Sequence, residues 1–411
     1  MDQYIAIVYL LNCLVIVSVC LTELSKIKLT HYSVYGICLI AYPSGTLEII
    51  DLVGLKLPEL TLMGVLWFPI FLLGVNLILS PGPFKFRPTV LLLMVPTFSA
   101  LIGGIFLNQT TKYPLLFLLL TLPFLRTYES AKHSVNIRDI IFLSLSIRLM
   151  IHFFSMLLQS QPQVGSCRSD KCNFFKSVIT PLGEQSNFMS MTFALIAPLL
   201  LSYISGKKFA LASIAILVNI DLTGGRTGLF AAVIVVFTVL LLKSNKIRNT
   251  RGIYSMFLAF GLLISSIPVM FTFPNDAFTG RGLIWQFAKN EAVKNPILGA
   301  GPSFWVRLAE NTSTVSLYSA HNIWLEIAAS TGIIAAFSFY LGMTRLLYKN
   351  TAENKSIIAP IIISLLLCGT FEVPILPYRL IQNPGIYLFL LYITSLRINL
   401  SESRELRNVK I

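Results

Sequence analysis

Charged side chains are scarce in this sequence. Asp, Glu, Lys and Arg together make up 12% of the 411 residues, whereas 55% of the residues are hydrophobic. A soluble protein of this length would carry roughly 25% charged residues. The apolar residues gather in runs of about 20, the length at which a helix crosses the hydrocarbon core of a bilayer. The composition therefore excludes an ordinary soluble domain and predicts an all-α, polytopic integral membrane protein.

Several motifs that mark well-known enzyme classes are missing too. The sequence has no P-loop, no Gly-x-Gly-x-x-Gly, no His-Glu-x-x-His, no Cys-x-x-Cys, no Gly-x-Ser-x-Gly and no Asp-x-Asp. These patterns hold nucleotides, metal ions or nucleophiles in place, so the sequence indicates none of the enzyme classes that they mark. There is also no internal repeat, which counts against a secondary transporter built from duplicated halves.

The apolar runs predict about 12–13 membrane-spanning helices in a single transmembrane domain over residues 1–411. The first run has no basic leader and no clear small-residue cleavage site, so we interpret it as a retained helix and not as a signal peptide. The predicted spans are 4–22, 31–50, 60–80, 89–107, 114–126, 139–160, 186–204, 209–221, 227–243, 252–272, 323–346, 356–371 and 384–398.

The distribution of Lys and Arg predicts the orientation of these spans. Most of the 32 basic residues fall in the connections on one side of the membrane and in the C-terminal segment, which marks that side as cytoplasmic. The net charge of +14 mostly reflects this bias, and it is no indication of nucleic-acid binding. Two long loops, 161–185 and 273–322, then lie outside. Because ATP and nucleotide sugars are not expected there, a donor substrate must arrive already activated.

The larger outer loop, 273–322, is predicted to contain short helical structure. Ile284, Phe287, Ala288 and Ala292 recur at helical spacing, which favours an amphipathic helix lying on the membrane surface. Thr279 or Gly280 would open this helix, Asn295-Pro296 would end it, and Gly299-Ala300-Gly301-Pro302 would make a tight turn.

The smaller outer loop, 161–185, contains Cys167 and Cys172. In an oxidising compartment the two would form a disulfide, and two free thiols are the alternative. The other four cysteines lie inside predicted spans, where they are packing residues.

His321 is the first candidate for chemistry. It lies with Asn322 where a polar stretch of the large loop passes into an apolar span. An imidazole is the side chain most easily tuned to accept a proton near neutral pH. An isolated histidine is more often structural, so a structural role is the alternative.

Two arginines are candidates for binding an anion. Arg281 begins the predicted surface helix, and its guanidinium has the planar fork that fits two phosphate oxygens. Arg226 follows two glycines at the outer end of a span, where a helix N-terminus would favour an anion. The alternatives are a solvated or headgroup-binding Arg281, and an Arg226 that positions the interface or pairs with Asp221.

Three further candidates for substrate binding lie near the large loop or in the last outer connection. Asn322 would orient a ligand or cap the helix that starts there, and Glu326, about one turn on, would hold a nearby arginine. Arg379 lies with Glu372 in the connection 372–383 and would close the site.

Arg148 and His152 are candidates within a span. They are four residues apart, so they share one helix face, and a charged side chain at membrane depth usually faces a cavity or a partner. They would line a path for the acceptor or the lipid. A structural ion pair with Glu48 or Asp51 is the alternative.

Three pieces of the second half of the chain follow one another in a fixed order. The first is Gly225-Arg226-Thr227-Gly228-Leu229, and the second runs from Thr279-Gly280-Arg281-Gly282 to Gly299-Ala300-Gly301. The third is His321-Asn322, nine residues and then Gly332. Together they resemble the superfamily of bacterial O-antigen ligases and related O-antigen or capsule polymerases. The ligases carry His-[Asn/Ser/Gln]-x9-Gly-x-x-[Gly/Thr/Tyr], and Ala335 departs from the last position of that pattern.

The resemblance implies a glycosyltransferase of the C-type membrane fold in the bacterial inner membrane, with a periplasmic active site. Its donor would be a glycan on undecaprenyl diphosphate, and neither a metal nor a cofactor would take part. Carried over position by position, Arg226 and Arg281 would bind the diphosphate and stabilise its charge as it leaves. His321 would act as the base on the acceptor hydroxyl, or position that hydroxyl, and the anomeric configuration would invert.

The acceptor distinguishes the functions that remain. An O-antigen ligase would transfer the finished glycan to a sugar of lipid A–core, and this is the leading hypothesis. An O-antigen or capsule polymerase would instead use a lipid-linked repeat unit. A flippase for lipid-linked glycans is a third hypothesis, in which Arg148 and His152 would be the key residues. Membrane lipids are partners in all three, and nucleic acid in none.

Overall fold

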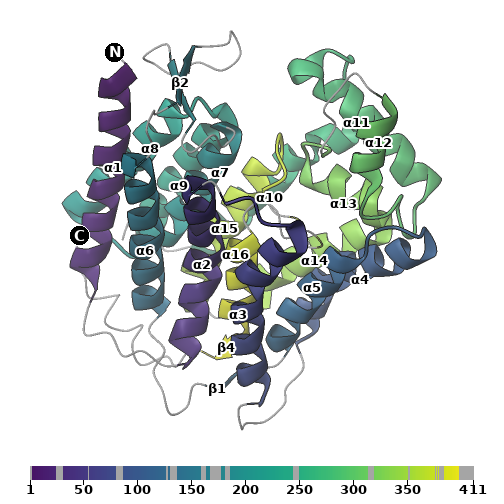
Figure 1. Ribbon diagram of the computed structural model, residues 1–411, viewed down its shortest axis with the longest axis horizontal. Helices are drawn as coiled ribbons and strands as arrows, with labels where there is room; N and C mark the ends of the chain where they lie inside the picture. Colours follow the sequence, from purple (N-terminus) through teal and green to yellow (C-terminus); the bar gives the residue numbers. More distant parts are fainter. Residues whose placement is uncertain are drawn as a thin grey trace. The chain divides into compact units, whose positions relative to one another are not determined.

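Helices make up nearly all of the regular structure (Figure 1). A computed structural model describes this set of residues: 2–24, 31–53, 55–79, 87–125, 128–129, 137–158, 163–166, 177–180, 186–243, 250–312, 319–349, 352–374, 376, 378 and 384–397. The predicted all-α fold class is confirmed. The likeness to the C-type membrane fold stays a prediction.

The chain divides into two compact units, which are described separately. The first unit comprises Met1–Phe84, Thr127–Arg248 and Leu388–Ile411, and the second comprises Lys85–Arg126 and Asn249–Tyr387. The prediction of a single transmembrane domain stays a prediction.

The first unit is a bundle of long apolar helices. In it α6 packs on both α1 and α2, and α7 packs on α9. Its short strands form two pairs, β2 antiparallel to β3 and β1 parallel to β4. The elements are α1 (Asp2–Glu23), α2 (His31–Val53), α3 (Glu59–Leu79), β1 (Tyr128–Glu129), α6 (Ile137–Leu158), β2 (Gln163–Ser166), β3 (Ser177–Thr180), α7 (Ser186–Leu201), α8 (Gly206–Leu222), α9 (Arg226–Lys243) and β4 (Leu396–Arg397), with α16 (Pro384–Ser395) at the border of the two units.

The second unit carries the large loop. Here α14 packs on α4, α15 on α10, and α13 on α11. Figure 1 shows α11, α12 and α13 gathered together, and their apolar faces share one core built around Trp285, Trp305 and Leu325. The elements are α4 (Pro88–Phe106), α5 (Lys112–Thr121), η1 (Leu122–Leu125), α10 (Thr250–Met270), α11 (Ala277–Lys294), α12 (Phe304–Thr312), α13 (Ile323–Thr331), α14 (Ile333–Lys349) and α15 (Ala352–Cys368).

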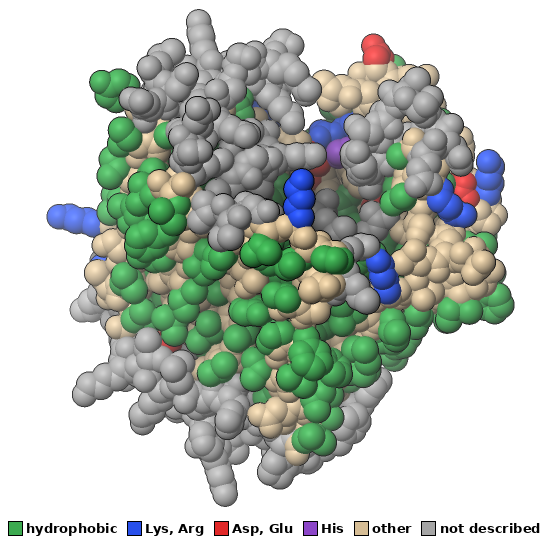
Figure 2. All heavy atoms as spheres, in the orientation of Figure 1, with side chains coloured by type: hydrophobic (Ala, Val, Ile, Leu, Met, Phe, Trp, Pro, Cys, Tyr) green, Lys and Arg blue, Asp and Glu red, His purple; other side chains and the backbone are tan. Residues whose placement is uncertain are grey.

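The lengths and compositions of these helices confirm a polytopic membrane protein. Within the described ranges, six helices are long and apolar enough to cross a bilayer: Ala6–Glu23, Ser33–Ile50, Thr61–Leu79, Pro88–Phe106, Ile137–Leu158 and Arg226–Lys243. Shorter apolar helices accompany them, including Asn187–Leu201 and Ile358–Cys368. The face shown in Figure 2 carries many hydrophobic side chains, as a surface in contact with lipid requires. The expected total of 12–13 spans stays a prediction.

Two features of the second unit differ from the sequence prediction. The predicted span 323–346 is broken at Gly332 into α13 and α14, because the backbone there turns away from helical geometry with a φ of 94°. The loop also contains a second helix, α12, which was not predicted from the sequence. The predicted helix of the loop is present as α11, which ends before Asn295-Pro296, and its place on the membrane surface stays a prediction.

Candidate active site at the start of α13

His321 stands on a strained piece of backbone. Its φ is 50°, in the left-handed region, which costs a residue other than glycine about 1–3 kcal/mol. Such a conformation persists only where neighbouring groups hold it, and here they are Asn322 and Glu326, which follow it in the chain. The side chain of His321 is 29% exposed. Its imidazole is thus fixed at its base and open to an approaching molecule.

Asn322 ties three helices together at this point. Its side-chain oxygen caps α13 by accepting from the backbone N–H groups of Trp324 (3.2 Å) and Leu325 (3.1 Å). Its amide nitrogen donates to the carbonyl of Ser265 in α10 at 2.9 Å, and to the carbonyls of Gly369 and Thr370 after α15 at 3.2 Å. The side chain is fully buried. The sequence left two roles open for Asn322, to orient a ligand or to cap the helix, and the geometry shows the cap.

Glu326 holds the other side of the turn. Its carboxylate is fully buried and accepts from the backbone N–H of Ala320 at 2.7 Å, the residue before His321. The hydroxyl of Tyr378 donates to the same carboxylate at 3.1 Å. Because the peptide next to His321 is anchored in this way, Glu326 fixes where the imidazole can lie.

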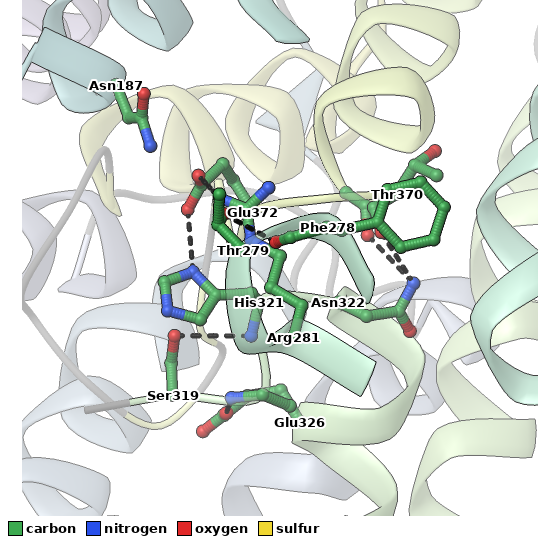
Figure 3. Close-up of polar contacts among 12 residues, drawn as sticks. Asn187, Phe278, Thr279, Arg281, Ser319, His321, Asn322, Glu326, Thr370 and Glu372 are labelled. Carbon is green, nitrogen blue, oxygen red and sulfur yellow. Dashed lines mark hydrogen bonds and ion pairs between the residues drawn. The ribbon is translucent and has the colours of Figure 1, made fainter. Parts of the chain in front are cut away.

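Glu372 joins His321 to Arg281. One carboxylate oxygen, Oε2, lies 3.0 Å from Nδ1 of His321, and the other, Oε1, pairs with the Nη2 atom of Arg281 (Figure 3). The side chain of Glu372 is only 9% exposed, so both interactions are partly shielded from water. If Nδ1 carries the proton and donates a hydrogen bond to Glu372, Nε2 is left with a free lone pair. In the described part of the chain, no hydrogen bond engages that Nε2 atom.

Arg281 follows an unusual stretch of α11. Phe278, Thr279 and Gly280 all have positive φ, at 52°, 62° and 88°, so the regular helix begins only after them. The side chain of Arg281 is 18% exposed. Beyond it, Trp285 and Ala288 anchor α11 in the core shared with α12 and α13. The arginine therefore stands at the junction between a strained turn and a firmly packed helix.

Gly332 explains why the pattern requires nine residues after Asn322. These nine residues are the whole of α13, which Asn322 caps at one end and Gly332 ends at the other. A Cβ atom on Gly332 would lie 2.2 Å from the carbonyl oxygen of Ile297, and the next N–H, of Ile333, donates to Pro296 at 2.7 Å. The segment after α11 thus lies directly against the end of α13, and a side chain at this position would force the two apart.

Arg226 lies in the first unit. It is exposed and begins α9, where the first backbone N–H groups of the helix have no intrahelical partner. Gly228, two residues on, has no room for a side chain, since a Cβ would lie 2.6 Å from the carbonyl oxygen of Ser190 in α7. The helix start that carries Arg226 is therefore packed tightly on α7, as the glycine in its motif requires.

Arg148 and His152, also in the first unit, belong to a buried polar cluster. Arg148 lies 2.5 Å from Oε1 of Glu48, and Nδ1 of His152 lies 2.9 Å from the same oxygen. The hydroxyl of Tyr9 is 2.9 Å from Nε2 of His152. The structural ion pair that the sequence left open as an alternative is thus present, with Glu48 as the partner.

Other predictions lie outside the described residues or were incomplete. Arg379, Cys167 and Cys172 are outside the described part of the chain. Glu372 was placed near the site by its position in the last outer connection, but nothing in the sequence indicated that it would contact both His321 and Arg281. The only signal was its position, a single acidic residue directly after a long apolar run.

In this helical membrane protein, Arg281 and His321 thus both contact the carboxylate of Glu372. Residues 211–340 match a family model described as O-antigen ligase, and this stretch includes Arg226, Arg281 and His321. The match supports membership of the superfamily of O-antigen ligases and polymerases. No curated protein and no solved structure matches the chain.

Proposed function

We propose that the protein is an O-antigen ligase that works on the periplasmic side of the bacterial inner membrane. It would transfer a polysaccharide from undecaprenyl diphosphate to a sugar hydroxyl of lipid A–core. The observation that carries the proposal is the contact of Glu372 with both Arg281 and His321. This contact brings an anion-binding group and a proton acceptor, the two groups that the transfer needs, to one carboxylate.

The transfer follows from the roles of these side chains. Nε2 of His321 takes the proton of the acceptor hydroxyl while that oxygen attacks the anomeric carbon of the donor. The bond from this carbon to the diphosphate oxygen breaks, and its electron pair leaves with the diphosphate. Arg281, with its planar fork of donors, stabilises the charge that develops there. Attack from the side opposite to the leaving group inverts the anomeric configuration.

The other candidate residues take supporting parts in this proposal. Asn322 and Glu326, which the sequence placed with the substrate, act as positioning residues because their polar atoms are engaged with the backbone around His321. Arg226 is assigned to the diphosphate by its match to the family pattern. The partnership of Arg148 and His152 with Glu48 favours a structural role for this cluster, and it gives no separate support to a flippase. The proposed reaction uses neither a metal nor a cofactor.

A polymerase is the second candidate, and Ala335 is the observation that favours it. The ligase pattern has Gly, Thr or Tyr at this position, whereas Ala335 is buried on α14, three residues after the helix break. A polymerase would use the same arginines and histidine with a lipid-linked repeat unit as acceptor.

The experiment that tests the proposal is a deletion strain analysed for its surface glycan. A ligase predicts long glycans retained on the lipid carrier and a bare core, restored by the wild-type gene and not by His321→Ala. Core that carries one repeat unit would show a polymerase instead. An unchanged glycan ladder would reject both enzymes. Lys294→Ala, which removes an exposed charge at the end of α11, is the matched control and should restore the ladder.

A further inference from the structure

Arg281 is paired with a carboxylate in the structure. Its guanidinium pairs with Oε1 of Glu372, so a diphosphate that approaches Arg281 meets a competitor for the same donors. The other oxygen of that carboxylate faces His321 at 3.0 Å. Any change in the pairing of Arg281 therefore changes the charge that faces the imidazole.

We propose that Glu372 is a positioning residue that couples donor binding to the activation of His321. The inference rests on the proposed function. The donor diphosphate displaces Glu372 from Arg281 and takes over the guanidinium. Glu372, no longer paired with Arg281, then acts more strongly on His321. The base is thus readied when the donor is in place.

The charges support this exchange. Arg281 and Glu372 together are neutral, so with Arg281 paired to Glu372 the imidazole of His321 faces a carboxylate whose charge is largely compensated. A diphosphate is a stronger partner for Arg281 because it offers more negative charge and more acceptor oxygens. Once it binds, the positive charge of Arg281 no longer offsets the carboxylate of Glu372 beside His321, and this favours the imidazolium that forms as the acceptor hydroxyl loses its proton.

The backbone just before Arg281 leaves room for the exchange, whereas just after it a Cβ atom on Gly282 would lie 1.8 Å from the carbonyl oxygen of Pro274. A Cβ atom on Gly280 would meet no atom within 4 Å, and Phe278 and Thr279 on the same turn are exposed. From Trp285 onward, in contrast, α11 is held in the buried core. A shift of the guanidinium from Glu372 toward a diphosphate therefore requires a change in the Arg281 side chain and its open turn, and it leaves the packed helix in place.

The proposal predicts opposite effects on binding and on turnover. Glu372→Gln keeps the size of the side chain and removes its charge, so Arg281 loses its competitor. We expect undecaprenyl diphosphate to bind the purified variant about 3- to 10-fold more tightly than wild type, while the turnover number falls roughly 10- to 100-fold. A merely structural role would weaken both. Weaker or unchanged binding by Glu372→Gln would overturn the proposal.

Three controls make the result specific. Glu291→Gln, the same chemical change on α11, should leave binding and turnover at wild-type values. In an Arg281→Ala background, Glu372→Gln should no longer tighten binding, because the guanidinium for which Glu372 and the diphosphate compete is absent. Glu372→Asp keeps the charge but retracts it by one methylene, so it should tighten binding less than Glu372→Gln and retain more turnover. Equal losses of binding and turnover in both Glu372 variants would contradict the proposal.

Binding and transfer assays of the wild-type protein distinguish a failure of this inference from a failure of the proposed function. If wild type neither binds undecaprenyl diphosphate nor transfers glycan from it, the proposed function is wrong and this inference is wrong with it. If wild type does both, and Glu372→Gln fails to tighten binding, the coupling alone is rejected.

Discussion

Asn322→Ala is expected to destabilise the protein by more than the loss of a helix cap alone. The side chain caps α13 with its oxygen and donates to three backbone carbonyls on α10 and after α15, and it is fully buried. An N-cap is worth about 1 kcal/mol, and a buried polar group left without a partner costs about 1–3 kcal/mol. The carbonyl of Gly369 keeps the N–H of Ile323 as a donor at 2.9 Å, so we expect the free energy of unfolding to fall by about 2–4 kcal/mol.

Two other variants at this position separate the cap from the donor. Asn322→Ser keeps a capping oxygen and loses the amide donor, so it should be less destabilised than Asn322→Ala. Asn322→Asp also keeps the cap, but its carboxylate would face the three carbonyl oxygens that the amide now satisfies. We expect Asn322→Asp to be at least as unstable as Asn322→Ala, although Asp is a good N-cap elsewhere.

The assay is thermal unfolding of the purified variants in detergent, followed by tryptophan fluorescence. Asn290→Ala, which removes an exposed asparagine from α11, is the control and should have the same unfolding midpoint as wild type. The expected order of midpoints is wild type, then Ser, then Ala, with Asp at or below Ala. An Asp variant as stable as wild type would refute the reasoning, because it would show that the amide donor contributes nothing to joining the three helices.

Three further predictions concern a glycine, a strained threonine and a buried ion pair. Gly332→Ala should lower the free energy of unfolding by about 2–4 kcal/mol, since its Cβ would lie 2.2 Å from a carbonyl oxygen, and thermal unfolding would show this as an earlier transition. Thr279→Gly should raise the same free energy by about 1 kcal/mol, because glycine adopts the left-handed backbone at φ 62° without strain; an unchanged unfolding midpoint would contradict it. Arg148→Ala should lower it by about 3–5 kcal/mol by leaving Glu48 buried without this cation, whereas glycan transfer per folded molecule, measured in vitro, should stay within a few-fold of wild type. Abolished transfer by folded Arg148→Ala would instead favour a direct role in substrate binding.

Local features of the second unit were predictable from the sequence. Apolar length predicts membrane helices, and the spacing of Ile284 and Ala288 together with Asn295-Pro296 predicts α11. The position of Asn322 before an apolar run is compatible with a cap and with a ligand, so sequence left both open. These inferences rest on neighbours in the chain, which is why they hold.

The contacts that build the site depend on residues far apart in the sequence. Glu372 contacts His321 from 51 positions away. The break at Gly332 lies where Ile297 approaches the backbone, and glycine is common enough inside membrane helices that the apolar run alone predicts one continuous span. Glu48 and Arg148 were brought together only as an alternative, because a buried charge requires a partner without indicating which one.

The most direct test of the account is glycan transfer by purified His321→Ala. With a glycan on undecaprenyl diphosphate as donor and lipid A–core as acceptor, wild type should form the linked product. His321→Ala should bind the lipid diphosphate normally and transfer the glycan roughly 10²- to 10⁴-fold more slowly, the usual contribution of a general base. Lys294→Ala should transfer at the wild-type rate. Transfer by folded His321→Ala within a few-fold of wild type would contradict the central claim that this imidazole accepts the proton.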